Sequence, residues 1–233
     1  MYLKNDVCKF FVRVLLVMVA ALSSLSLQAA GSPEGEARFG FAINPFSLPA
    51  LATGVEGGLL SLEFAARSED SRFELAMPIW YQNLDYDGPA YGYGSGFPRD
   101  LEYKYFAMDL ALRYYINPET SRFYIGPVLR YQHESGGLAD WETYPEYVNA
   151  DESPKIRQSH VGAGVTVGFG RKQRRESLIQ YWGSSLTFGR LLGGDRKPIE
   201  YPFGFFNFMT MTSSGSEEKY FWDFTFFRWG LLF

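Results

Sequence analysis

Residues 219–233 read KYFWDFTFFRWGLLF, and their side chains would form two different surfaces if this segment is a strand. Arg228 would then lie near mid-depth of a membrane-spanning strand of about ten residues, where a lipid-facing cation costs about 2–4 kcal/mol. We therefore expect Arg228 to point inward and the odd-numbered row to face lipid. Asp223 interrupts that row only at the far rim, where the penalty falls to about 0–1 kcal/mol. The expected outward row is Phe221, Asp223, Thr225, Phe227, Trp229 and Leu231.

A last strand that ends in Phe after alternating apolar residues resembles the closing strand of bacterial outer-membrane β-barrels. The resemblance implies an assembly signal that the barrel-assembly machinery reads. Arg228 departs from the pattern, because many members of that class carry glycine there. The alternative is the edge strand of a soluble β-sandwich, but such edges usually carry charges or proline. The residues that match the assembly signal are Phe227, Trp229, Leu231 and Phe233.

Composition excludes a helical membrane protein. The 233 residues are 46% hydrophobic and 18% aromatic, yet their mean hydropathy is −0.16. Each helical span needs about 20 consecutive apolar residues, and one such run stands near the amino terminus. It follows basic residues and ends in Ala29 and Ala30, which is the pattern of a cleaved secretory signal peptide. We predict a signal peptide at 1–30 and a barrel at 31–233; an uncleaved membrane anchor is the alternative.

Cysteine and charge exclude several classes of site. Cys8 is the only cysteine and would leave with the signal peptide, so the mature chain is expected to have no disulfide, thiolate metal site or cysteine nucleophile. Cys8 also precedes the apolar run, which disfavours a lipid anchor. A formal charge of −4 with scattered basic residues disfavours nucleic acid as a partner. We expect no cofactor and no metal.

Alternating segments and their connections predict the architecture. Three short connections, SEDS, NPETS and RKQRR, alternate along the chain with three long ones at 83–100, 134–154 and 189–218. Outer-membrane barrels have short turns at one end and long loops at the other. The prediction is an all-β, eight-stranded antiparallel up-and-down transmembrane barrel in the cell outer membrane. Its strands are expected at 38–43, 59–67, 73–82, 102–116, 122–133, 156–171, 177–188 and 219–233.

The inward rows of these strands carry charges of both signs. An eight-stranded barrel is just wide enough for side chains to fill, so buried charges must meet one another. Folding about NPETS places Asp109 opposite Arg130 within about one residue, and glycines at 162, 164, 168 and 170 would make room for long side chains opposite. We predict ion pairs that plug the lumen; the alternative is a water-filled pore, which typically needs 16 or more strands. The predicted network is Glu63, Glu74, Asp109, Arg113, Arg130 and Arg228.

One short motif offers an enzymatic alternative. His133-Glu134-Ser135 resembles the His-x-Ser element of outer-membrane lipid A deacylases, which implies His133 as a base and Ser135 as a nucleophile toward lipid acyl esters. Gly136 and Gly137 stand where that family commonly has Asn-Ala, which puts oxyanion stabilisation in question. The alternative is an interfacial histidine at a strand end.

The segment 134–152 is acidic and aromatic, with six carboxylates and no basic residue. Such oxygen ligands suit Ca²⁺ or Mg²⁺ bridging to lipopolysaccharide phosphates, whereas the alternative is a solvated loop, since no calcium-loop spacing is present. The leading interpretation is a monomeric barrel without enzymatic chemistry. It would have a structural, adhesive or surface-interaction role through its long loops, with outer-membrane lipid and lipopolysaccharide as partners.

Overall fold

The computed structural model describes the strands of the chain and part of their connections. The described residues are 37–44, 59–68, 72–87, 100–117, 121–138, 140–150, 154–175, 178–192, 195–199, 210–212 and 219–232. The predicted signal peptide lies outside them, as do most of the predicted loops at 83–100 and 189–218. Within these ranges, no helix has the length and apolar character needed to cross a lipid bilayer.

Nine strands and one 3₁₀ turn make up the described structure. They are β1 (Ala37–Ile43), β2 (Leu59–Ser68), β3 (Phe73–Asp87), β4 (Asp100–Asn117), β5 (Ser121–Gly137), η2 (Trp141–Thr143), β6 (Lys155–Arg175), β7 (Leu178–Leu192), β8 (Thr210–Thr212) and β9 (Tyr220–Leu232).

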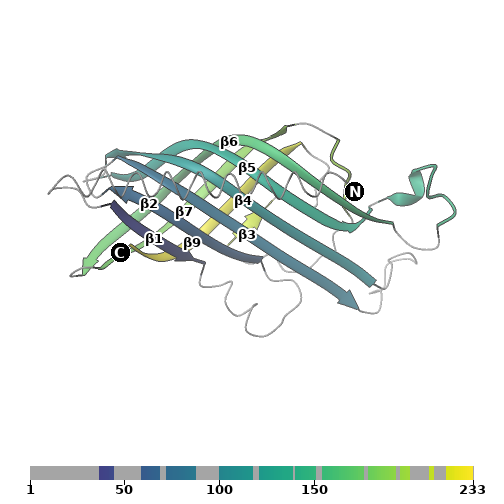
Figure 1. Ribbon diagram of the computed structural model, residues 1–233, viewed down its shortest axis with the longest axis horizontal. Coiled ribbons are helices and arrows are strands. Elements are labelled where there is room, and N and C mark those ends of the chain that lie inside the picture. The colour runs from purple at the N-terminus through teal and green to yellow at the C-terminus, as the bar shows by residue number, and fades with distance from the viewer. Residues whose placement is uncertain are drawn as a thin grey trace.

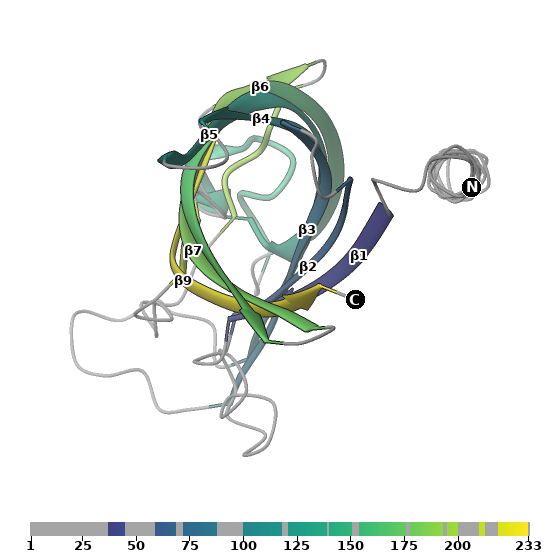
Figure 2. The same ribbon diagram turned by 90° about the vertical axis from the view of Figure 1, so that its left-hand side faces the viewer.

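The strands close into a ring. Each of β1 to β6 pairs with the strand that follows it, β7 pairs with β9, and β9 pairs back with β1, all antiparallel. Eight strands therefore form the wall of a barrel, which Figure 1 shows from the side and Figure 2 from one end. The short strand β8 pairs with Asp223–Thr225 of β9, on the edge that β1 occupies further along. The predicted eight-stranded antiparallel barrel is confirmed.

Strand lengths differ from the prediction at both ends of the barrel. The prediction that RKQRR is a turn was wrong, because these residues pair with the start of β7. At the opposite end, β3, β5 and β7 continue four or five residues into the segments predicted as loops. Backbone hydrogen bonds between strands continue beyond the apolar part of the wall, because polar side chains in contact with water are compatible with strand pairing. We call the two ends the short-turn end, at 69–71, 118–120 and 176–177, and the long-loop end.

The two faces of the wall have opposite character. On β4, Asp109 and Arg113 point inward and are 1% and 3% exposed, whereas Leu112 and Ile116 point outward and are 45% and 57% exposed. The same alternation holds along β3, β5 and β6, as their sequences predict. Small side chains of neighbouring strands, such as Ala76, Ala111 and Val128, form a tight inner layer. Along these strands, the inward rows therefore consist mainly of polar or small residues and the outward rows mainly of apolar ones.

The closing strand contains a bulge that its alternation did not reveal. Between Gly183 and Ser185, β7 advances two residues while β9 advances three, from Arg228 to Thr225. Such an extra residue reverses which parity faces inward. Arg228 and Trp229 lie on the predicted faces. Asp223 and Phe221 are buried, so the predicted outward row was wrong for the residues that precede Phe227 in β9. The barrel interior gains a carboxylate as a result.

Candidate functional site

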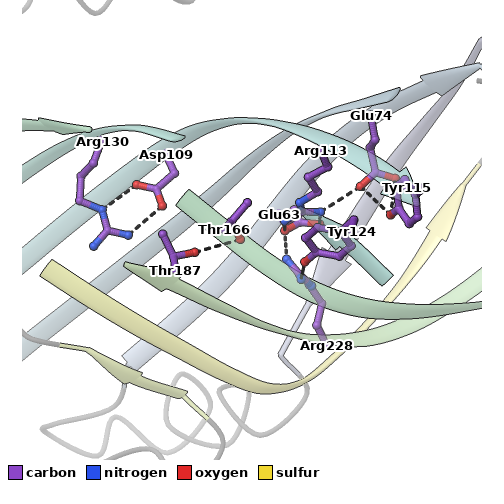
Figure 3. A network of polar contacts seen from close by, with 10 residues as sticks. All are labelled: Glu63, Glu74, Asp109, Arg113, Tyr115, Tyr124, Arg130, Thr166, Thr187 and Arg228. Carbon is purple, nitrogen blue, oxygen red and sulfur yellow. Dashed lines mark hydrogen bonds and ion pairs between the residues drawn. The ribbon is translucent and has the colours of Figure 1, made fainter. Parts of the chain in front are cut away.

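Three polar networks occupy the barrel interior at successive depths. The network nearest the short-turn end, which we call the inner network, centres on Arg113. Its Nη1 and Nη2 donate to Glu63 on β2 at 2.8 and 2.6 Å, and Nη1 also donates to Glu74 on β3 at 2.9 Å. Figure 3 shows Arg113 beside Glu63 and Glu74, which come from the consecutive strands β2 and β3. A bidentate guanidinium–carboxylate contact is among the stronger hydrogen-bonded pairs in proteins.

Arg228 and two tyrosines complete the inner network. Arg228 forms a second ion pair with Glu63 and donates to the Tyr124 hydroxyl at 3.2 Å. The Tyr115 hydroxyl donates to both oxygens of Glu74 at 3.1 Å. Because β9 supplies Arg228 and β2 supplies Glu63, the ion pair joins the last strand of the wall to one of the first.

A glycine makes space for this cluster. A Cβ atom at position 168 would lie 2.3 Å from the ring of Tyr124, so the tyrosine occupies the volume that a side chain on β6 would need. The sequence predicts this pairing of inward glycine with a long side chain opposite.

The middle network centres on Arg130. Its Nε and Nη2 donate to the two oxygens of Asp109 at 2.6 and 2.8 Å, and its Nη2 also pairs with Asp223. The guanidinium carbon lies 4.2 Å from the ring centre of Phe221 and 4.9 Å from that of Trp80. Cation–π contacts of this kind strengthen when water is excluded. Arg130 is thus held by two carboxylates and two rings.

The outer network closes the long-loop end and includes a segment that folds back toward the lumen. Glu134 of β5 forms an ion pair with Arg196, and Gln132 donates to Glu134 at 2.7 Å. The Gln158 side chain binds the backbone of Lys197 through both its oxygen and its nitrogen, at 3.0 and 2.8 Å. Ile199 forms an isolated bridge with Leu138 and packs against Tyr103 and Trp80. Residues 195–199 therefore cover part of the barrel mouth.

Charge inside the barrel is balanced. Within the described ranges, five carboxylates and five arginines are buried. Buried charges are tolerated when they are paired and hydrogen-bonded, because each would otherwise lose its hydration without compensation. The six residues that the sequence singles out belong to the inner and middle networks. The members that it does not identify are Arg67, Glu134, Arg196 and Asp223.

The histidine motif has a different serine partner from the expected one. His133 Nδ1 lies 2.8 Å from the Oγ of Ser159 on β6, and the Tyr131 hydroxyl donates to the same oxygen at 3.2 Å. Ser135 stands two residues along β5, opposite Lys104 on one side and Arg157 on the other. Glu134 between them is buried in the lumen. The outer wall therefore holds a His133–Ser159 pair.

A carboxylate and two lysines meet beyond the apolar part of β4. Glu102 accepts a hydrogen bond from Lys104 and another from Lys155 at 3.1 Å. These hydrogen bonds, with the charges of the same two lysines, lower the pKa of Glu102 to about 2. Glu102 is thus ionised throughout the physiological range.

The acidic segment forms a compact loop. Residues 140–150 contain consecutive turns, with backbone hydrogen bonds such as Tyr147 N to Tyr144 O at 2.9 Å, and Asp140 adopts a left-handed conformation. No cluster of three or more metal-ligating side chains occurs within the described ranges. Glu134, which the sequence assigns to this loop, belongs instead to β5 and the outer network.

The residues of the expected assembly signal lie at the end of β9. Trp229 is exposed on the outer wall, Leu231 is half-buried, and Phe227 is half-buried at the bulge. Phe233 lies outside the described residues.

The chain is similar to two solved structures at low sequence identity. Neisserial surface protein A (NspA) is 12% identical, with 84% of this chain and 92% of that chain covered and a TM-score of 0.38. A major outer membrane protein from Thermus thermophilus is 13% identical, with 84% and 98% covered and a TM-score of 0.38. No protein-family model matches the chain, and no curated protein matches it. The strand pairing described above carries the assignment of the fold.

Proposed function

We propose that this chain is an integral outer-membrane β-barrel with a closed lumen, whose long-loop end carries a structural or surface-interaction role. One observation carries the proposal: the wall exposes large apolar side chains while the interior holds paired charges. Among the described residues, every large hydrophobic side chain that is exposed, except Val148, lies on a strand of the barrel, including Phe123, Leu129 and Phe188 at 56–58% exposure. A water-soluble protein rarely exposes an apolar surface this extensive, whereas lipid requires it.

Fractionation and gel mobility test the membrane assignment. We expect the protein in the outer-membrane fraction, resistant to carbonate extraction, and running faster on an unheated gel than after boiling. A closed barrel with this much cross-strand pairing should resist detergent until heated. Recovery in the soluble fraction, with no change of mobility on heating, would contradict the proposal.

The ion-paired networks support a closed lumen. Side chains from β2, β3, β4, β5, β6 and β9 contribute to them, and aromatic rings fill space between the charges. Eight-stranded barrels have interiors of the size that side chains fill, whereas aqueous channels occur in larger barrels. The same proposal includes a monomer whose closing strand is recognised by the barrel-assembly machinery.

Residues 140–150, the described part of the loop between β5 and β6, are best placed for an interaction role. The Leu138 amide donates to the Pro154 carbonyl at 2.9 Å, and Lys197 lies 5.4 Å from the ring centre of Tyr144, so the loop is anchored at its base and along its side. Glu142 and Glu146 are exposed on it. Replacing 140–150 by a short glycine-serine linker should leave the heat-dependent mobility unchanged and abolish binding to host or envelope partners. Unchanged binding would assign that role elsewhere.

The His133–Ser159 contact favours a second candidate, hydrolysis of lipid acyl esters. Since the Tyr131 hydroxyl donates to Ser159, the serine hydrogen is available to His133 Nδ1, as a general base requires. Ser159 Oγ would attack the ester carbonyl, His133 would pass the proton to the leaving alcohol, and water would release the acid.

Reconstituted protein incubated with lipopolysaccharide or phospholipid tests this second candidate. Fatty-acid release that Ser159→Ala abolishes and Ser135→Ala preserves would support hydrolysis at Ser159. The reverse pattern would assign the expected Ser135. No release from the wild-type protein would reject the enzyme.

A further inference from the structure

A group of cations lies on the outer wall at the long-loop end. Lys104 of β4, Ser135 of β5 and Arg157 of β6 are consecutive cross-strand partners, so the three side chains form one row across neighbouring strands. Lys155, two residues before Arg157 on the same strand, points to the same side. The row lies across β4, β5 and β6, which are neighbouring strands of the wall (Figure 1).

Among the described side chains of this group, cations outnumber carboxylates. Lys104 and Lys155 both form ion pairs with Glu102, and Asp85 of β3 is the cross-strand partner of Glu102. Arg157 is exposed and has no ion-pair partner among the residues that the structure describes. The side chains of Lys104 and Lys155 remain 47% and 60% exposed. Arg157 and the two exposed lysines could therefore contact an anionic ligand.

The surface below the cations becomes apolar toward the barrel middle. The next row toward the barrel middle contains Phe106, His133 and Ser159, and the row after it contains Tyr131 and Val161. Val161 is 44% exposed and Leu129 is 58% exposed. A ligand that touches both surfaces must have an anionic head and hydrocarbon chains. Free phosphate would contact only the cations.

We propose that Arg157, Lys104 and Lys155 bind the phosphomonoester head group of a membrane lipid, with its acyl chains lying along β5 and β6. The inference rests on the proposed membrane insertion of the barrel. Basic clusters at a membrane surface attract anionic lipids, and a guanidinium binds phosphate through two parallel hydrogen bonds. Ser135, between Lys104 and Arg157, offers a hydroxyl donor at the same height.

Phosphatidic acid serves as the probe, titrated into detergent-solubilised full-length protein and followed by native mass spectrometry, with phosphatidylcholine for comparison. We expect tighter binding of phosphatidic acid and about a tenfold loss of that affinity in Arg157→Gln. Glu102→Gln should raise the affinity about threefold, because it releases two lysines from their carboxylate. Arg190→Gln is the matched control, an exposed arginine near the same end of β7, and it should change nothing.

The outcomes separate the sources of phosphate. Millimolar inorganic phosphate should not displace phosphatidic acid; full displacement would overturn the lipid part of the inference. Equal affinities in the wild-type protein and Arg157→Gln, or equal losses in Arg157→Gln and Arg190→Gln, would overturn the site itself. Heat-dependent mobility of each variant is measured in parallel, so that failure of the barrel to fold is distinguished from failure to bind lipid.

Discussion

Arg130 is a side chain whose loss would leave two carboxylates buried without a counter-charge. In Arg130→Met, Asp109 and Asp223 would remain inside the barrel without their shared guanidinium. Breaking a buried ion pair by removing one partner typically costs about 3–5 kcal/mol. We expect the free energy of unfolding to fall by about 4 kcal/mol in urea titrations of refolded protein in micelles.

Two further variants test whether unpaired charge is the cause. Arg190→Met, on the exposed outer wall, should change the free energy of unfolding by less than about 0.5 kcal/mol. Adding Asp109→Asn and Asp223→Asn to Arg130→Met removes the uncompensated charge and should recover most of the loss. Equal stability of Arg130→Met and the wild-type protein would show that the middle network does not stabilise the fold.

Two inward glycines of β6 give a second contrast between single residues. A Cβ at Gly168 would lie 2.3 Å from the Tyr124 ring, whereas a Cβ at Gly170 would have its nearest neighbour, the Trp182 carbonyl oxygen, at 3.9 Å. Overpacking of this kind typically costs about 1–3 kcal/mol. Gly168→Ala should therefore lower the urea midpoint and Gly170→Ala should not. Equal midpoints would mean that Tyr124 moves aside without cost.

The bulge in β9 predicts different effects for two single-residue deletions. Removing Phe227 deletes the extra residue, so β9 and β7 can pair regularly while Thr225, Asp223 and Arg228 all still face inward. Removing Phe224 also allows regular pairing with Asp223 inward, but it places the Phe226 side chain in the lumen and Thr225 on the outer wall. We expect both proteins to show the heat-dependent gel shift and ΔPhe224 to have the lower urea midpoint. A ΔPhe224 protein as stable as ΔPhe227 would contradict the assigned bulge.

The elements also show where sequence reasoning succeeds. Alternation along β4 and β5 fixes the register around NPETS to within about one residue, and Asp109 pairs with Arg130 as predicted at that precision. Counting does not reveal the one-residue register shift between Tyr115 and Asn117. Strict alternation fails in β9, because Phe226 and Phe227 are both apolar and no glycine marks the extra residue. The position of Asp223 therefore depends on tertiary pairing with Arg130, which a single strand does not reveal.

Contacts from connections are harder still to predict than contacts between strands. Arg196 pairs with Glu134 although it lies in a segment with no strand period, and the sequence offers no signal for that pairing. Ser159 was missed for a related reason, since it meets His133 across strands rather than along one. Only the register between β5 and β6 brings them together, and the long loop predicted at 134–154 between these strands leaves that register undetermined.

Considered as a whole, the barrel interior contains three networks in series, and this arrangement predicts its behaviour as a channel. Ions crossing the lumen would pass Arg196 and Glu134, then Arg130, and finally Arg113 with its partners. Opening one network leaves two others in the path. We therefore expect no current steps in planar bilayers from the wild-type protein or from Arg196→Ala, although the latter loses the ion pair that holds residues 195–199 over the mouth. A refolded large porin in the same bilayers is the positive control, because its current steps show that insertion can be detected. Steady current through Arg196→Ala alone would mean that the deeper networks do not close the lumen and that residues 195–199 are its gate.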